Sequence, residues 1–120
     1  MKDCLFCKIV KGEIPSERVY EDDDILAFKD IAPAAHVHIL IIPKLHIDGA
    51  DALSHDEPKH AEIAGNLIMT AGKLAHELGL KDGWRIVTNV LTHGGQTVRH
   101  LHFHLLGGEQ LGDFGSKLLF

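Results

Sequence analysis

The stretch HLHFHLL, residues 100–106, alternates three histidines with apolar side chains. Successive side chains of a β-strand point to opposite faces, so a strand here places all three imidazoles on one face. Leu101, Phe103 and Leu105 then point the other way, into a core. Each imidazole has two nitrogens that need partners, so three on one face without a role would be costly. The stretch therefore predicts a strand with a core face and a chemical face.

Segments on either side of this stretch predict the rest of the fold. Apolar residues at three- and four-residue steps predict a long helix over 57–79, and residues 4–11 predict a short N-terminal helix. Strands, one long helix and further strands indicate an α+β fold, in which the helix packs on a mostly antiparallel sheet of about five strands. The predicted strands are residues 18–21, 25–29, 36–43, 84–89 and 100–106.

The ends of the long helix carry capping signals. Ser54 with Glu57 fits a capping box, and Asp56 is a rival N-cap. Gly79 stands where a C-terminal cap is expected, because glycine adopts the left-handed backbone conformation without strain. These signals predict a helix that begins next to Glu57 and ends before Gly79.

Composition narrows the classes of function. The chain has 120 residues and a mass of 13.2 kDa, which predicts a single domain over residues 1–120. A net charge of −5 does not attract nucleic acid or an anionic membrane through the overall field. No apolar run approaches the roughly 18 residues of a membrane-spanning helix, and no secretory signal is recognisable. Together with only two cysteines, these features predict a cytoplasmic protein without a nucleic-acid or membrane partner.

Two kinds of chemistry are open to three histidines in register. They could hold a catalytic zinc with one open position, or one could be a nucleophile that its neighbours orient. The preceding loop, HGGQTV at residues 93–98, favours the nucleophile. Paired glycines let backbone N–H groups approach an anion, and Gln96 and Thr97 add uncharged donors. A neutral imidazole is available at about pH 7 and attacks an anionic phosphorus centre without charge repulsion.

These residues resemble the histidine triad (HIT) family of nucleotide hydrolases and transferases, in its Hint-like purine nucleoside phosphoramidase branch. The resemblance implies hydrolysis of purine nucleoside 5'-phosphoramidates through a covalent nucleotidyl-histidine, in a homodimer whose sheets join edge to edge through the strand near the long helix. A dinucleoside polyphosphate hydrolase, a nucleotidyl transferase, a zinc-dependent hydrolase and a nucleotide-binding regulatory protein remain open. Arg99 departs from the branch, which often has an aromatic residue there, and leaves the leaving-group preference open. Besides the triad, the resembling segments are residues 5–9, 12–15, 28–33, 41–44, 94–96 and 107–108.

The resemblance also implies roles for individual residues. His102 corresponds to the nucleophile, and His104 to the contact with the phosphoryl group and its departing partner. His38 corresponds to a fourth histidine that hydrogen-bonds within the triad, whose first member is His100. Asp30 corresponds to the carboxylate that accepts the ribose hydroxyls. The other implied nucleotide-binding residues are Phe28, Phe6, Leu5, Ile9 and Leu40 around the base, and Asn89, Gln96 and Thr97 beside the phosphate.

A second motif, Cys4-x-x-Cys7, has the spacing of a zinc knuckle. From the residues alone, a redox pair and two buried thiols on a helical turn remain open. Relatives that keep this pair complete a tetrahedral zinc site with two histidines, which correspond here to His46 and His100. The resemblance thus implies a structural zinc that orients the segment bearing His102, while the chemistry itself needs no cofactor.

Overall fold

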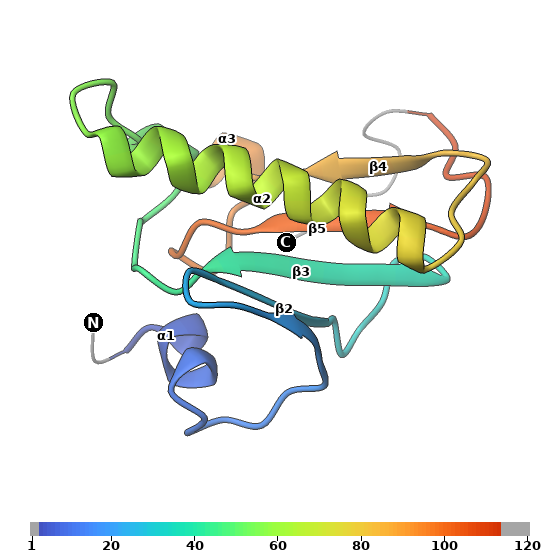
Figure 1. The fold of residues 1–120 in the computed structure, drawn as a ribbon, viewed down its shortest axis with the longest axis horizontal. Coiled ribbons are helices and arrows are strands. Elements are labelled where there is room, and N and C mark those ends of the chain that lie inside the picture. Colours follow the sequence, from blue (N-terminus) through green and yellow to red (C-terminus); the bar gives the residue numbers. More distant parts are fainter. Residues whose placement is uncertain (1–2, 114–120) are drawn as a thin grey trace.

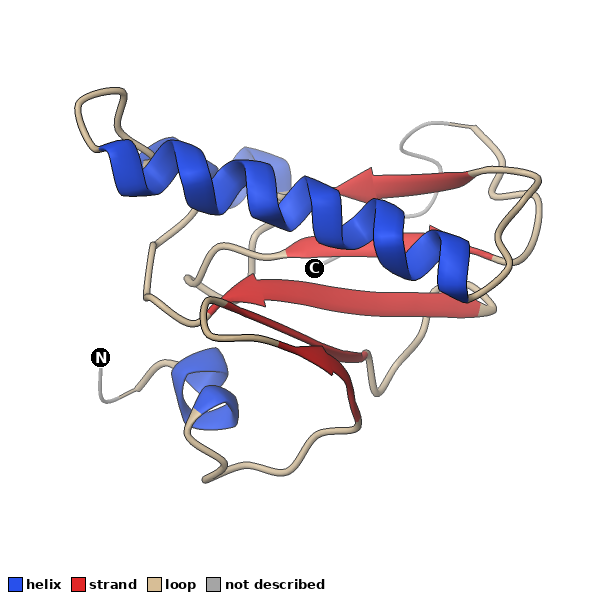
Figure 2. Ribbon diagram, viewed as in Figure 1, coloured by secondary structure: helices blue, strands red, loops and turns tan. Residues whose placement is uncertain are grey.

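A five-stranded antiparallel sheet forms the centre of the structure, with strand order β1-β2-β3-β5-β4 (Figure 1). The computed structural model describes residues 3–113. The α+β fold predicted from the sequence is confirmed (Figure 2). The strands are β1 (Arg18–Glu21), β2 (Ile25–Lys29), β3 (Val37–Pro43), β4 (Trp84–Val87) and β5 (Phe103–Gly107). The helices are α1 (Leu5–Val10), α2 (Pro58–Glu77) and the single turn α3 (Leu91–Gly94), with a 3-10 turn at Ala50–Ala52.

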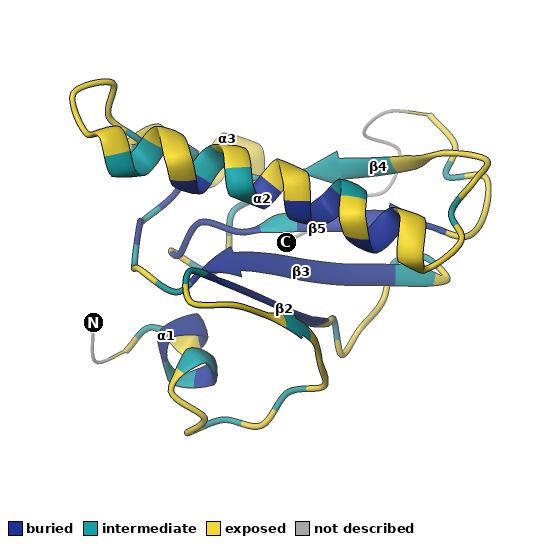
Figure 3. Ribbon diagram, viewed as in Figure 1, coloured by how far each residue is buried: buried dark blue, intermediate teal, exposed yellow. Residues whose placement is uncertain are grey.

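Helices cover both faces of the sheet, and alternation along the strands divides the core between them. The apolar side of α2, with Leu67 at its centre, packs against one face (Figure 3). On the opposite face, α1 packs Phe6 and its neighbours against β2 and β3. On β3, Ile41 belongs to the α2 side and Leu40 to the α1 side. Since side chains two apart share a face, His38 lies with Leu40 on the α1 side.

The long helix keeps its predicted apolar period but begins differently. Its N-cap is Glu57, and Pro58 takes the first helical position, where a missing N–H leaves no hydrogen bond unmade. The predicted capping box of Ser54 with Glu57 is wrong, as is Asp56 as N-cap. The Ser54 hydroxyl instead accepts from the N–H of Asp56 at 3.2 Å, in a turn before the helix. Gly79, with φ of 73°, follows the last turn and caps it as predicted.

The triad segment is only partly a strand. β5 begins at Phe103, so the predicted strand 100–106 starts too early, and of the triad only His104 lies in the sheet. The backbone before β5 bonds elsewhere, because the N–H of Leu101 donates to the carbonyl of Ile47 at 2.6 Å. The predicted alternation is still confirmed, since Leu101 packs in the α2-side core.

The other predicted elements are confirmed with small shifts at their ends. The hairpin of β1 and β2 has the predicted bounds, and β3 begins one residue late, at Val37. β4 ends at Val87, so Asn89 lies outside the sheet. The turn α3 is not predicted by any local pattern in the sequence. Among residues 3–113, no helix combines the length and apolar character needed to cross a membrane.

Candidate active site

A pocket on the α1 side of the sheet lies between α1, β2 and the loop that leads into the triad. Its walls are largely apolar, and His102 and His104 line it. The structure therefore gathers, from distant parts of the chain, most of the residues that the sequence predicts around a nucleotide. Those that line the pocket are Leu5, Phe6, Ile9, Phe28, Asp30, Leu40 and Thr97.

Several lining residues are not predicted from the sequence. Ile14 and Pro15 lie in a segment that supports the family resemblance, and Val98 follows the glycine pair, but no local pattern shows that they face the pocket. Their place depends on the path of the chain between α1 and β1 and of the loop after α3. The full set is Ile14, Pro15, Ser16, Lys29, Ile31 and Val98.

The hydrogen bonds of His102 determine which of its nitrogens can act as a nucleophile. Its Nδ1 lies 2.7 Å from the carbonyl oxygen of His100. A carbonyl can only accept, so Nδ1 carries the proton and Nε2 carries the lone pair. The side chain is 3% exposed, and the ring of Phe6 meets it edge-on with centroids 5.0 Å apart. His102 is therefore held in one orientation beside the pocket.

His38 and His104 form a second hydrogen-bonded unit with Asp30. The N–H of Ala34 donates to Nδ1 of His38 at 2.9 Å, so the proton of His38 is on Nε2. That Nε2 lies 2.8 Å from Nδ1 of His104, which must accept, and His104 therefore carries its own proton on Nε2. Burial lowers the pKa of His38, while the Asp30 carboxylate, 3.4 Å from Nε2, opposes that shift. His104 thus carries its proton on Nε2 and is linked through His38 to the carboxylate of Asp30.

The paired glycines end the turn α3 instead of forming an anion cradle. Gly95 has φ of 79° and closes the turn. The N–H groups of Gly94 and Gly95 donate to carbonyls earlier in the turn at 3.1 Å each. The predicted cradle of backbone donors is therefore wrong in this structure, because the turn uses those groups itself. Among the residues that the structure describes, Asn89 and Gln96 do not line the pocket.

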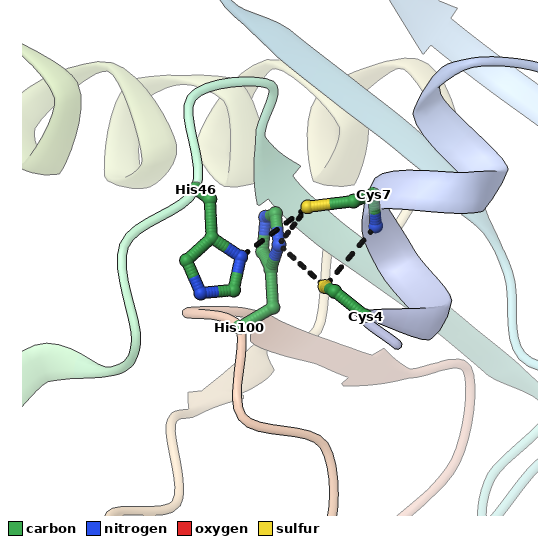
Figure 4. A group of neighbouring side chains, drawn as sticks. All are labelled: Cys4, Cys7, His46 and His100. Atoms are coloured by element: carbon green, nitrogen blue, oxygen red, sulfur yellow. Dashed lines mark hydrogen bonds between the residues drawn. The ribbon is translucent and has the colours of Figure 1, made fainter. Parts of the chain in front are cut away.

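Two thiols and two imidazoles, one of them from the triad member His100, form a cluster (Figure 4). Cys4 is the N-cap of α1, and its Sγ is 3.3 Å from Nδ1 of His100. Cys7, on the first turn, places Sγ 3.3 Å from Nδ1 of His46 and 3.6 Å from Nδ1 of His100. All four ligand atoms lie within 4.8 Å of one another. Tetrahedral zinc with sulfur and nitrogen ligands separates them by about 3.6 Å, so the cluster fits that ion.

The outer nitrogens of the two imidazoles in this cluster have acceptors. Nε2 of His100 donates to the carbonyl of Pro43, and Nε2 of His46 to the carboxylate of Asp48, at 2.8 Å each. Both Nδ1 atoms therefore carry lone pairs directed toward the thiols. Burial lowers the pKa of His100 to about 4, and burial with the Cys4 contact raises the pKa of Cys7 to about 11. Without a metal, His100 is thus neutral and the Cys7 thiol is protonated at neutral pH.

The triad does not form one metal site. His100 turns Nδ1 to the cysteines, His102 bonds to a backbone carbonyl, and His104 bonds to His38. Ligand atoms of Asp30, His38 and His104 also lie within 4.8 Å of one another, but a hydrogen bond joins the two histidines. This division of partners does not suit the alternative of a zinc ion held by all three triad histidines.

Residues 11–111 match the HIT domain family. The chain is 45% identical over 112 residues to the purine nucleoside phosphoramidase of Escherichia coli strain K12, covering 92% of each chain. It is 50% identical over 107 residues to the adenylylsulfatase HINT1 of Arabidopsis thaliana, covering 89% of this chain and 72% of that one.

Two further similarities concern the metal cluster and the fold. The chain is 50% identical over 109 residues to the 14 kDa zinc-binding protein of Brassica juncea, covering 91% of this chain and 96% of that one. A HIT family hydrolase from Clostridium thermocellum superposes with a TM-score of 0.89 at 45% identity, covering 96% of this chain and 98% of that one.

The fold, the pocket beside the buried histidines and these similarities define an enzyme of the hydrolase class. The chain belongs to the HIT family. The resemblance first drawn from residues 100–106 is thereby confirmed.

Proposed function

We propose that this protein cleaves purine nucleoside 5'-phosphoramidates through a nucleotide bonded covalently to His102. The observation that carries the proposal is the hydrogen bond from Nδ1 of His102 to the carbonyl of His100, which leaves the lone pair on Nε2. A neutral nitrogen nucleophile suits an anionic phosphorus centre. Two relatives, named purine nucleoside phosphoramidase and adenylylsulfatase, support a nucleotide as the substrate.

The pocket supports a two-step reaction. The apolar walls cover the base, and Asp30, which also lines the pocket, accepts from the ribose. Nε2 of His102 bonds to phosphorus, and the P–N bond breaks. The departing amine keeps the electron pair and takes the proton from Nε2 of His104. Water then attacks the nucleotidyl-His102, returns a proton to His104 and restores the imidazole. His38 holds His104 in the tautomer that presents a proton on Nε2.

The competing substrate within the family is a dinucleoside polyphosphate. Each added phosphate brings negative charge that a cation must balance. Among the described residues that line the pocket, the single lysine is Lys29, and its ammonium group already pairs with the carboxylate of Glu17 at 2.8 Å. We therefore expect kcat/KM for adenosine 5'-phosphoramidate to exceed that for a diadenosine polyphosphate by at least about tenfold, which corresponds to about 1.4 kcal/mol. A steady-state comparison of the two tests this. Equal values, or binding of AMP without cleavage of either compound, would contradict the proposal, and the second outcome would favour a regulatory protein.

We also propose that Cys4, Cys7, His46 and His100 hold a structural zinc ion. The donor set and its spacing support this, and a relative is named as zinc-binding. Bound zinc would keep the thiols deprotonated and fix the ring of His100. Because the backbone carbonyl of His100 accepts from His102, the ion would steady the nucleophile without taking part in the reaction.

A homodimer joined through β4 is the assembly that we propose. β4 is an edge of the sheet, and an unpaired strand edge offers N–H and C=O groups to a second chain. Trp84, the single tryptophan, lies on it and is 41% exposed. Sedimentation equilibrium at micromolar concentration is expected to give twice 13.2 kDa. Dilution should shift the Trp84 emission to the red as the mass falls, and a monomeric mass at all concentrations would contradict this assembly.

A further inference from the structure

The side chain of Gln96 is saturated with hydrogen bonds inside the protein. Its Nε2 donates to the carbonyls of Asp48 and Val98 at 2.9 and 3.0 Å. Its Oε1 accepts from the N–H of Leu91 at 3.0 Å and from Nη1 of Arg99 at 2.9 Å. An amide has two protons and two lone pairs, so all four sites are used. Gln96 therefore cannot contact a phosphate without breaking bonds that hold the loop.

Arg99 joins this amide to a neighbouring segment. Its guanidinium donates to both carboxylate oxygens of Asp51, at 2.9 and 2.8 Å, while Nη1 also reaches Gln96. Gly49 lies against this contact, and a Cβ there would stand 2.7 Å from both Nη1 of Arg99 and Oδ1 of Asp51. The site therefore has room for the two-bond pair only because residue 49 has no side chain.

We propose that Gln96, Arg99 and Asp51 form a clamp that positions the backbone between the pocket wall and the nucleophile. The clamp ties residues 48–51 to residues 96–99, just ahead of the triad. An exposed ion pair adds little to stability, so we assign Arg99 a role in positioning. The inference rests on the proposed function, because it concerns catalysis at His102.

Backbone contacts carry the effect of the clamp to the site. Thr97 and Val98 line the pocket, and the carbonyl of Val98 accepts both from Gln96 and from the N–H of His100 at 2.9 Å. The carbonyl of His100 in turn accepts from His102. A shift of residues 96–99 therefore moves the group that selects the tautomer of the nucleophile.

Loss of the clamp should change turnover more than binding. The walls that cover the base come from α1, β2 and β3, none of which contributes a residue to the clamp. A small misplacement of a reacting group can cost up to about a hundredfold in rate. We expect Arg99→Ala to lower kcat by about tenfold or more while KM stays within about twofold. Arg99 and Gln96 are thus positioning residues.

Gly49→Ala tests the same clamp without removing a polar group. Gly49 has an extended backbone, with φ of −178°, so alanine adds no backbone strain. Its methyl group displaces the side-chain ends of Arg99 and Asp51 and also stands 3.2 Å from Oε1 of Gln96. We expect it to lower kcat as Arg99→Ala does. The double variant should be no worse than the lower single one within about twofold, because both act on one contact. Arg99→Lys, which cannot form the two-bond pair, should fall between.

Steady-state kinetics and backbone hydrogen exchange together decide the proposal. The control is Lys73→Ala, which removes an exposed ion pair with Glu77 on α2 and should keep wild-type kcat. Exchange at residues 91–99 should rise in the clamp variants, whichever nucleotide is cleaved. Unchanged kcat, additive effects in the double variant, or unchanged exchange would overturn the clamp. If the wild type cleaves only a diadenosine polyphosphate, the proposed function fails, while kcat on that substrate still measures the clamp.

Discussion

Replacing His102 with alanine is expected to lower the hydrolysis of adenosine 5'-phosphoramidate by at least about 1,000-fold, because the covalent step loses its nucleophile. Rapid mixing of the wild type with substrate, acid quenching and intact-mass measurement should show a nucleoside monophosphate bonded to the protein. The alanine variant should show no such adduct. The mass of this adduct identifies the base, and its presence shows the covalent mechanism.

A matched variant separates the loss of the nucleophile from the loss of packing. His102 is 3% exposed, so truncation to alanine also leaves a cavity. His102→Asn keeps an N–H that can donate to the carbonyl of His100 but has no nucleophilic ring nitrogen, and it should be equally inactive. His55→Ala, at an exposed position, should keep wild-type turnover. Turnover above about a tenth of wild type in His102→Asn would contradict covalent catalysis by this residue.

Removal of zinc is expected to lower the melting temperature by more than about 10 °C. A ligand present at about 1,000 times its dissociation constant stabilises the folded state by about 4 kcal/mol, and each kcal/mol is worth about 4 °C in a domain of this size. Cys7→Ser removes one buried ligand and should lose the ion. Calorimetry, with elemental analysis of the purified protein, measures both changes.

Chelation provides the control for the zinc prediction. Wild type stripped of metal by a chelator should melt near Cys7→Ser, and added zinc should restore only the wild type. Because zinc has no part in the chemical steps proposed above, the stripped wild type should keep kcat within about tenfold below its melting range. A purified wild type with no zinc, or a melting temperature that a chelator leaves unchanged, would count against the site. Loss of all turnover in a folded, metal-free protein would instead favour a metal-dependent hydrolase.

Local pattern explains what could be predicted of the fold. The three- and four-residue spacing of apolar residues identifies α2, and the alternation in residues 100–106 separates a core face from a histidine face. Both patterns involve neighbours within a few residues, where chain geometry alone dictates which side chains share a side. The ends of elements were harder to predict. Glu57 displaced Ser54 as N-cap because Pro58 takes the first helical position.

Contacts between distant segments decide the rest of the site. Family resemblance implied a place for Gln96 beside the phosphate, but its amide is used by Asp48, Val98, Leu91 and Arg99. The glycine pair predicted a cradle, but the turn α3 uses its N–H groups. Neither outcome can be derived from a loop alone, because the partners come from packing that local propensity does not describe.

From the sequence alone, the chain is an α+β protein with three histidines on one face and a resemblance that names His102 as nucleophile. Only the tertiary structure decides which nitrogen of each imidazole carries the proton. A ring nitrogen is a donor or an acceptor according to the group it meets, and two of these groups are distant in the chain: His104 for His38 and Pro43 for His100. The thiol of Cys4 meets His100 across 96 residues. Such meetings follow from how helices and sheet pack, and the order of residues along the chain does not contain them.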